Sequence, residues 1–125
     1  MIVGVGLDLV EIQRVKAALD RFGERFALRV LLPSEWEYCR QQRVPSVPFA
    51  GRFAAKEAAS KAFGVGIGAQ LSWTDLEVTR NALGKPTLAL HGSALQLMQS
   101  LGARGTHLSL THTEKTAAAV VILEN

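Results

Sequence analysis

The chain contains a single cysteine, Cys39, among its 125 residues. One thiol cannot form an internal disulfide bond, and it has no second cysteine with which to share a metal ion. This composition excludes a disulfide-stapled secreted scaffold and a cysteine-based zinc site, and it favours a cytoplasmic protein. Cys39 itself is expected to be an ordinary helix residue without a catalytic role.

Long hydrophobic runs are also absent. The longest apolar stretches, such as residues 117–123, are far shorter than the roughly 20 residues that a helix needs to span a bilayer. The first residues lack the basic start and the long apolar region of a secretory signal, because the charge of Asp8 follows only a short apolar segment. We therefore expect no membrane span, no membrane partner and a cytoplasmic location.

Aromatic residues make up only 6% of the chain, and 14 Lys and Arg residues are nearly balanced by 11 Asp and Glu residues. A module that binds nucleic acid presents aromatic platforms or a contiguous basic stripe. The sequence shows neither, so no nucleic-acid partner is expected. Hydrophobic residues, by contrast, reach 48%, which is enough for the core of one domain that spans residues 1–125.

Hydrophobic periodicity predicts helices mainly in the first half of the chain. Residues 2–9 alternate with the period of a strand, and the small side chains of Gly4 and Gly6 on one face imply close approach by another element. From Val10 onward the spacing becomes helical, which places Asp8 at a strand-to-helix corner. Residues 49–63, rich in alanine and ending at Gly64, give the strongest helix prediction.

The second half reads as short strands, so the predicted fold is α+β with a mainly antiparallel sheet packed with helices. A helix is predicted to begin with a capping box at Ser34, and residues 41–48 are predicted as a loop. No internal repeat is present. The remaining expected elements are strands at 76–80, 87–90, 107–111 and 117–123, a turn at 81–86 and a helix at 93–101.

Two carboxylates are candidates for a metal site. Glu57 lies one helical turn after Phe53 and one turn before Lys61, and its apolar neighbours make an ionised carboxylate costly unless a cation compensates. Lys61 could supply that charge, or a metal could bridge Glu57 to Asp8. The simpler alternatives are an exposed Glu57–Lys61 pair and an Asp8 that caps the following helix.

Several polar residues could meet phosphate groups. Arg52 and Lys56 share the opposite side of the 49–63 helix, and Lys85 lies in the later turn at 81–86. Taken alone, such cations are better explained as a solvated charged face. His112 follows the strand at 107–111, where hydroxyl groups and an imidazole gather. Strand ends commonly carry binding groups, but an exposed histidine without a function is the alternative.

Residues 5–12 read VGLDLVEI, and residues 51–64 read GRFAAKEAASKAFG. These segments resemble the first and second motifs of the holo-[acyl-carrier-protein] synthases, whose second motif has the pattern R-F-A-x-K-E-A-x-x-K-A-x-G. The segments 84–86, GKP, and 109–113, SLTHT, fit as well. The resemblance therefore covers essentially the whole chain and implies the 4′-phosphopantetheinyl transferase fold.

The resemblance implies an enzyme of fatty-acid biosynthesis that transfers the 4′-phosphopantetheine arm of coenzyme A to a serine of apo acyl carrier protein and releases adenosine 3′,5′-bisphosphate. Mg²⁺ would be bound by Asp8 and Glu57, and Lys61 would be a further catalytic residue; Mg²⁺ prefers such oxygen ligands. Either Glu57 or a metal-bound water could accept the serine proton. The implied coenzyme-binding residues are Arg52, Lys56, Lys61, Gly64, Lys85, Pro86, His112 and Thr113.

The same resemblance implies a homotrimer with active sites at subunit interfaces, where the Asp8 motif and the Glu57 helix could come from neighbouring subunits. Acyl carrier proteins are small and acidic, so a basic surface would speed and orient docking. Arg14, Arg21 and Arg25 are expected to supply it. The main alternative is a non-catalytic coenzyme A-binding protein, which would have no need for Asp8 and Glu57 together.

Overall fold

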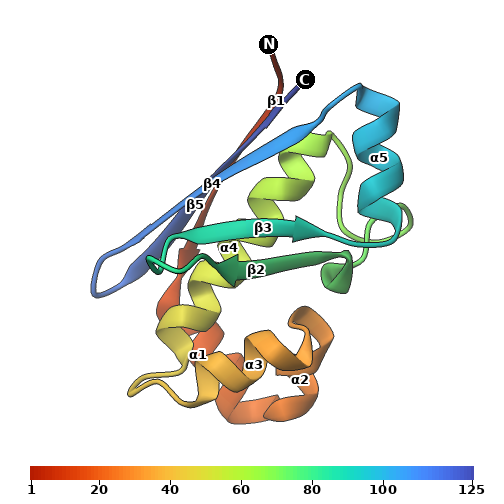
Figure 1. Cartoon of the computed structure of the whole chain (residues 1–125). Helices are drawn as coiled ribbons and strands as arrows, with labels where there is room; N and C mark the ends of the chain where they lie inside the picture. Colours follow the sequence, from red (N-terminus) through yellow and green to blue (C-terminus); the bar gives the residue numbers. More distant parts are fainter.

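The computed structural model describes residues 1–125 as two antiparallel sheets, five α-helices and one short 3₁₀ helix (Figure 1). Along the chain the elements are β1 (Ile2–Glu11), α1 (Ile12–Phe22), α2 (Glu24–Val30), α3 (Pro33–Arg40), α4 (Ser46–Phe63), η1 (Trp73–Asp75), β2 (Leu76–Arg80), β3 (Pro86–Leu90), α5 (Ser93–Leu101), β4 (Gly105–His112) and β5 (Thr116–Glu124). This arrangement confirms the predicted α+β class.

Helix α4 occupies the centre of the molecule. The sheet β1-β5-β4, with β5 in the middle, lies on one side of this helix, and the β2-β3 hairpin lies on another (Figure 1). Helices α1, α2 and α3 gather at the end of the molecule where α4 begins, and α5 lies at the opposite end. No helix is both long enough and apolar enough to cross a membrane.

Strand β1 is longer than predicted, and this changes the place of Asp8. Antiparallel pairing with β5 continues to Glu11, which lies opposite Thr116, so the backbone stays extended beyond residue 9. Glu11 is the residue that precedes α1, and its side chain forms no capping hydrogen bond. Asp8 therefore lies inside the strand, and the alternative that it caps the helix is wrong.

Two helix starts also differ from the prediction. Helix α3 begins at Pro33, and Glu35, rather than Ser34, caps it by accepting the backbone N–H of Leu32 at 2.8 Å. Helix α4 begins at Ser46, so it includes part of the predicted loop. Pro48 is tolerated there because an N–H group in the first helical turn has no partner within the helix.

The glycines of β1 let α4 approach its backbone closely, as their small size predicts. A Cβ atom placed on Gly6 would lie 1.7 Å from the carbonyl oxygen of Ala58, and one on Gly4 would lie 2.2 Å from that of Ala62. Both obstacles are backbone atoms, which cannot rotate away as a side chain can. This close contact brings Asp8 on β1 next to the last turns of α4.

We expect Gly6→Ala to lower the free energy of unfolding by about 3 kcal/mol, because the added methyl group forces β1 and α4 apart. Urea unfolding measures the change. Gly66→Ala is the matched control, since nothing lies within 4 Å of a Cβ atom at Gly66. Equal unfolding midpoints for the two variants would contradict the close packing described here.

Two hydrophobic clusters form the core. The larger has 17 buried residues, mostly from the three-stranded sheet, the hairpin, α4 and α5, and the smaller has nine residues, mostly from α1 to α4. Helix α4 contributes Ala58 and Ala62 to the larger cluster, and Phe49 and Ala50 to the smaller. Because one helix joins both clusters, we propose that residues 1–125 fold as one domain.

Lys56 is completely buried, and its ammonium group forms an ion pair with Glu35 at 2.7 Å. The same group donates hydrogen bonds to the carbonyl oxygens of Val30 at 2.7 Å and Trp73 at 3.1 Å. Glu35 also accepts the backbone N–H of Val78 at 2.8 Å. Burial lowers the pKa of Lys56, while the charge of Glu35 opposes that change.

This network corrects the expectation for Lys56. A lysine ammonium group has three N–H donors, and all three are used inside the protein. Lys56 is therefore neither part of a solvated surface nor free to bind a phosphate of coenzyme A. Its role is structural, because it fastens α4 to α2, α3 and the segment leading into β2.

Candidate functional site

Asp8 and Glu57 meet in one cavity of about 320 Å³. Strand β1 supplies Asp8, helix α4 supplies Glu57, and the two elements pack directly against each other. Both carboxylates therefore come from the same chain, and the expectation that neighbouring subunits supply them separately is wrong. The other residues that line this cavity are Leu9, Val10, Arg14, Val15, Phe26 and Phe53.

Lys61 faces Asp8 rather than Glu57. Its ammonium group lies 3.2 Å from Oδ1 of Asp8 and donates a hydrogen bond to the carbonyl oxygen of Leu7 at 3.1 Å. The alternative of a Glu57–Lys61 pair is wrong, because Glu57 takes part in no ion pair. The side chain of Lys61 is 55% exposed, so it can also reach a ligand.

The electrostatics of the cavity favour a bound cation. Burial raises the pKa of Glu57, the negative charge of Asp8 raises it further, and Lys61 partly offsets both effects. Two carboxylates in one partly buried cavity repel each other unless a positive charge lies between them. A divalent cation would remove this repulsion and favour the ionised form of Glu57.

The donor set fits Mg²⁺ better than a metal that needs a complete protein cage. No group of three or more His, Cys, Asp or Glu side chains that could hold a metal ion is present. Mg²⁺ is commonly bound by one or two carboxylates and completes its shell with water and substrate phosphate. Asp8 and Glu57 supply those two carboxylates and leave the remaining positions open to a phosphorylated substrate.

A second cavity, of about 500 Å³, contains three of the residues expected to bind the coenzyme, Arg52, Pro86 and His112. None of its lining residues is acidic, and none also lines the cavity of Asp8 and Glu57. Arg43 and Arg80 line this cavity but were missed by the sequence reasoning. Arg80 could have been found from its place just before the turn that contains Lys85.

The structure does not bring the other expected coenzyme residues into these two cavities. Lys85 is exposed in the turn between β2 and β3, and Gly64 ends α4 with a left-handed φ of 78°. Thr113 lies in the β4–β5 turn, where its hydroxyl oxygen accepts the backbone N–H of Thr116 at 3.1 Å. With His112, Thr113 lines a neighbouring surface hollow.

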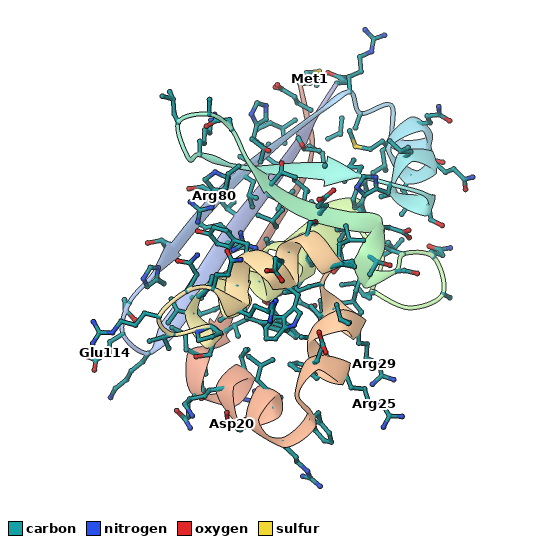
Figure 2. The ribbon with its side chains drawn as sticks, turned by 60° about the horizontal axis from the view of Figure 1, so that its bottom comes forward. Met1, Asp20, Arg25, Arg29, Arg80 and Glu114 are labelled. Carbon is teal, nitrogen blue, oxygen red and sulfur yellow. The ribbon has the colours of Figure 1, made fainter.

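The arginines expected to dock a carrier protein lie on α1 and α2. Arg14 lines the cavity of the two carboxylates, which places a basic side chain at its edge. Arg21 is exposed near the end of α1, and Arg25 lines a hollow on α2 together with Arg29, which the sequence reasoning missed. Figure 2 shows Arg25 and Arg29 on one side of the molecule and Arg80 on the opposite side.

Cys39 is buried in α3, in agreement with its expected structural role. Burial raises the pKa of its thiol to about 11, because the thiolate would lose its hydration. The thiol is therefore protonated near neutral pH. A protonated and inaccessible thiol is a poor nucleophile, which excludes Cys39 from the chemistry of the site.

Known proteins resemble this chain over its whole length. The sequence pattern of the 4′-phosphopantetheinyl transferase superfamily matches residues 4–120. A holo-[acyl-carrier-protein] synthase of Koribacter versatilis (strain Ellin345) is 48% identical over 125 residues, which is 100% of both chains. The crystal structure of the synthase from Neisseria meningitidis aligns with a TM-score of 0.92 and 35% identity, covering 100% of both chains.

A further solved structure carries a ligand. The holo-[acyl-carrier-protein] synthase of Helicobacter pylori, in complex with coenzyme A, aligns with a TM-score of 0.85 and 34% identity over 96% of this chain and 99% of the other. The similarity thus includes sequence, fold and chain length. It extends through both β1 and α4, the elements that hold Asp8 and Glu57.

Proposed function

This chain belongs to the holo-[acyl-carrier-protein] synthases of the 4′-phosphopantetheinyl transferase superfamily, and we propose that Asp8, Glu57 and Lys61 form its catalytic centre. Enzymes of this family transfer the 4′-phosphopantetheine moiety of coenzyme A to a serine of apo acyl carrier protein, and this chain has that activity. The observation that carries the proposed centre is the convergence of Asp8 and Glu57 on one cavity.

We propose Mg²⁺ as the cofactor, held by Asp8 and Glu57. When bound, the ion supplies positive charge that polarises the pyrophosphate of coenzyme A. The raised pKa of Glu57 supports this assignment, because burial and the nearby charge of Asp8 both make its ionised form costly until a cation compensates it. A cytoplasmic location remains our proposal for this enzyme.

The side chains of the centre have separable tasks. The serine hydroxyl of the carrier attacks the phosphorus that bears the pantetheine arm, and the bond to the phosphate of adenosine 3′,5′-bisphosphate breaks. Lys61, which is more than half exposed beside Asp8, can neutralise charge on the phosphoryl and leaving oxygens. Glu57 is the chain's own candidate to accept the serine proton, because its carboxylate lines the cavity in which the reaction is proposed to occur.

We propose that the cavity of Arg52, Pro86 and His112 binds the adenosine bisphosphate part of coenzyme A. The absence of acidic residues from its lining supports an anionic ligand. Lys61 is the proposed contact of the pyrophosphate, and Gly64, Lys85 and Thr113 stay proposed contacts on the strength of the family motifs alone.

An apolar face of β1 supports the proposal of a homotrimer. The exposed fractions of Val5, Leu7 and Leu9 are 57%, 66% and 71%, and along β1 they alternate with Gly4 and Gly6, which contact α4. Exposed apolar patches of this kind mark surfaces that a partner covers. We propose that three copies cover it and place active sites at their interfaces; a monomeric mass by light scattering would contradict this.

The reaction can be tested by measuring the intact mass of apo acyl carrier protein after incubation with this protein, coenzyme A and Mg²⁺. We expect a gain of one phosphopantetheine arm, and no gain in a parallel sample with excess chelator. A gain in both samples would contradict the metal assignment. No gain with any of several carriers would favour the non-catalytic coenzyme A-binding alternative.

Arg14→Glu should raise the KM for carrier protein about tenfold and change the KM for coenzyme A less than about twofold, because charge reversal opposes an acidic partner. Steady-state kinetics with each substrate varied in turn measure both constants. Arg104→Glu is the control, since Arg104 is exposed just before β4 and lines neither cavity described above. Equal effects of Arg14→Glu on both constants would rule out the docking role.

A further inference from the structure

The ring of Tyr38 contacts two arginines in the cavity of about 500 Å³. The guanidinium carbon of Arg52 lies 4.4 Å from the ring centroid, and that of Arg80 lies 4.8 Å from it. The three residues come from α3, α4 and the end of β2, so only the folded chain brings them together. Cation–π contacts at these distances hold a guanidinium group in place without neutralising its charge.

Neither arginine has an acidic partner. Both are absent from the ion pairs of the protein, and none of the residues lining the cavity is a carboxylate. Two guanidinium groups around one ring repel each other, and a concave site concentrates their field. An anion bound between the two guanidinium groups would relieve this repulsion.

Arg52 also has a buried hydrogen-bond donor for which the protein supplies no acceptor. It is only 3% exposed, and its buried Nε has no hydrogen-bond partner, although Nη1 donates to the carbonyl oxygen of Pro48 at 3.2 Å. A buried donor without an acceptor is costly, and buried polar groups in folded proteins are nearly always paired. An anion in the cavity could supply the acceptor that the protein does not.

Arg80 is held from its other side by the β2–β3 turn. Its Nη1 donates to the carbonyl oxygen of Gly84 at 3.1 Å, and the residue lies opposite Pro86 in the hairpin. Gly84 has a φ of 84°, a conformation that few residues other than glycine adopt easily. The turn and Tyr38 together fix Arg80 at the cavity, which suits a ligand recognised by geometry as well as by charge.

We infer that Tyr38 is a positioning residue, which holds Arg52 and Arg80 as a paired site for the 3′-phosphate monoester of coenzyme A. This inference rests on the proposed function. Coenzyme A carries a pyrophosphate, which the Asp8–Glu57 centre takes, and one phosphate monoester, which is largely dianionic at neutral pH. Two arginines match that dianion in charge and in hydrogen-bond geometry.

The inference makes Tyr38 a determinant of donor selectivity. The test compares coenzyme A with 3′-dephospho-coenzyme A as donors to apo acyl carrier protein. In Tyr38→Leu, the preference for coenzyme A, measured as the ratio of the two kcat/KM values, should fall about tenfold, mainly through the KM for coenzyme A. Tyr38→Phe keeps the ring and should retain the preference of the unmodified protein.

Two further variants separate positioning from a general loss of structure. Arg80→Gln leaves Tyr38 in place and should reduce the preference as Tyr38→Leu does, so it decides the question if Tyr38→Leu does not fold. Arg40→Gln, on the exposed end of α3 beside Glu37, is the matched control and should leave the ratio unchanged. Thermal unfolding of each variant identifies those that are simply unstable.

The outcomes distinguish this inference from the function on which it rests. An unmodified protein that transfers equally well from both donors, or Tyr38→Leu and Arg80→Gln variants that keep the full preference, would overturn the inference and leave the transferase intact. Loss of transfer from both donors to the same extent would show a structural role for Tyr38. No transfer from either donor by the unmodified protein would overturn the proposed function itself.

Discussion

Glu57→Gln should lower the rate of phosphopantetheine transfer by about a thousandfold or more and leave the protein folded. The substitution keeps the shape of the side chain but removes the charge that we assign to metal binding and proton transfer. Folding should not suffer, because Glu57 has no ion pair to lose. Burial and Asp8 raise the pKa of Glu57, so the charged form is disfavoured in the folded protein and a neutral amide relieves that cost.

Single-turnover transfer, followed by the intact mass of the carrier, measures this loss over a range of Mg²⁺ concentrations. Glu37→Gln is the matched control, because Glu37 is an exposed helical glutamate that pairs with Arg40 at 2.6 Å. It lies on α3, which contributes no residue to the cavity. The control should turn over like the unmodified protein. An unchanged rate for Glu57→Gln at saturating Mg²⁺ would remove Glu57 from the catalytic centre.

Lys56→Met should lower the free energy of unfolding by about 3–5 kcal/mol, because it leaves the carboxylate of Glu35 buried without its cation. The carbonyl oxygens of Val30 and Trp73 would also lose the donor that they share. A natural domain is stable by only about 5–15 kcal/mol, so this variant would be close to unfolding at room temperature. Removing Glu35 as well would not restore the loss, since the N–H groups of Leu32 and Val78 would lack an acceptor.

The same substitution at a second lysine separates burial from ion pairing. Lys16 forms an ion pair with Asp20 at 2.7 Å, the same distance as in the Lys56–Glu35 pair, but both partners are exposed on α1. Lys16→Met should cost no more than about 0.5 kcal/mol. Urea unfolding of the two variants gives the comparison, and equal losses would show that the depth of Lys56 does not matter.

Elements defined by local signals could be predicted closely from the sequence. Helix α5 has the predicted bounds, because an amphipathic run ending at Gly102 needs no distant partner to define it. The end of β1 was wrong, because its length depends on pairing with β5, more than a hundred residues away along the chain. The start of α4 was wrong because prolines are common both in loops and in the first helical turn.

The candidate site, too, could be predicted only in part from the sequence. The residues alone allowed several roles for Asp8 and Glu57, and only the packing of α4 on the glycines of β1 shows that they share a cavity. Lys56 was misplaced because lysines are usually at the surface, and its buried partner Glu35 lies 21 positions away. The contacts of Tyr38 join three elements, so no local pattern could have revealed them.

The packing of the smaller hydrophobic cluster decides what intrinsic fluorescence can report. The chain has two tryptophans; Trp36 meets Phe49 edge to face at 6.3 Å, and Trp73 lies 4.9 Å from Phe53, measured between ring centroids. Both indoles therefore pack against α4, and Phe53 also lines the cavity of the two carboxylates. Strands β1, β4 and β5 contain no tryptophan. Emission spectra will therefore report most directly on the helical half of the molecule and on the wall of the cavity.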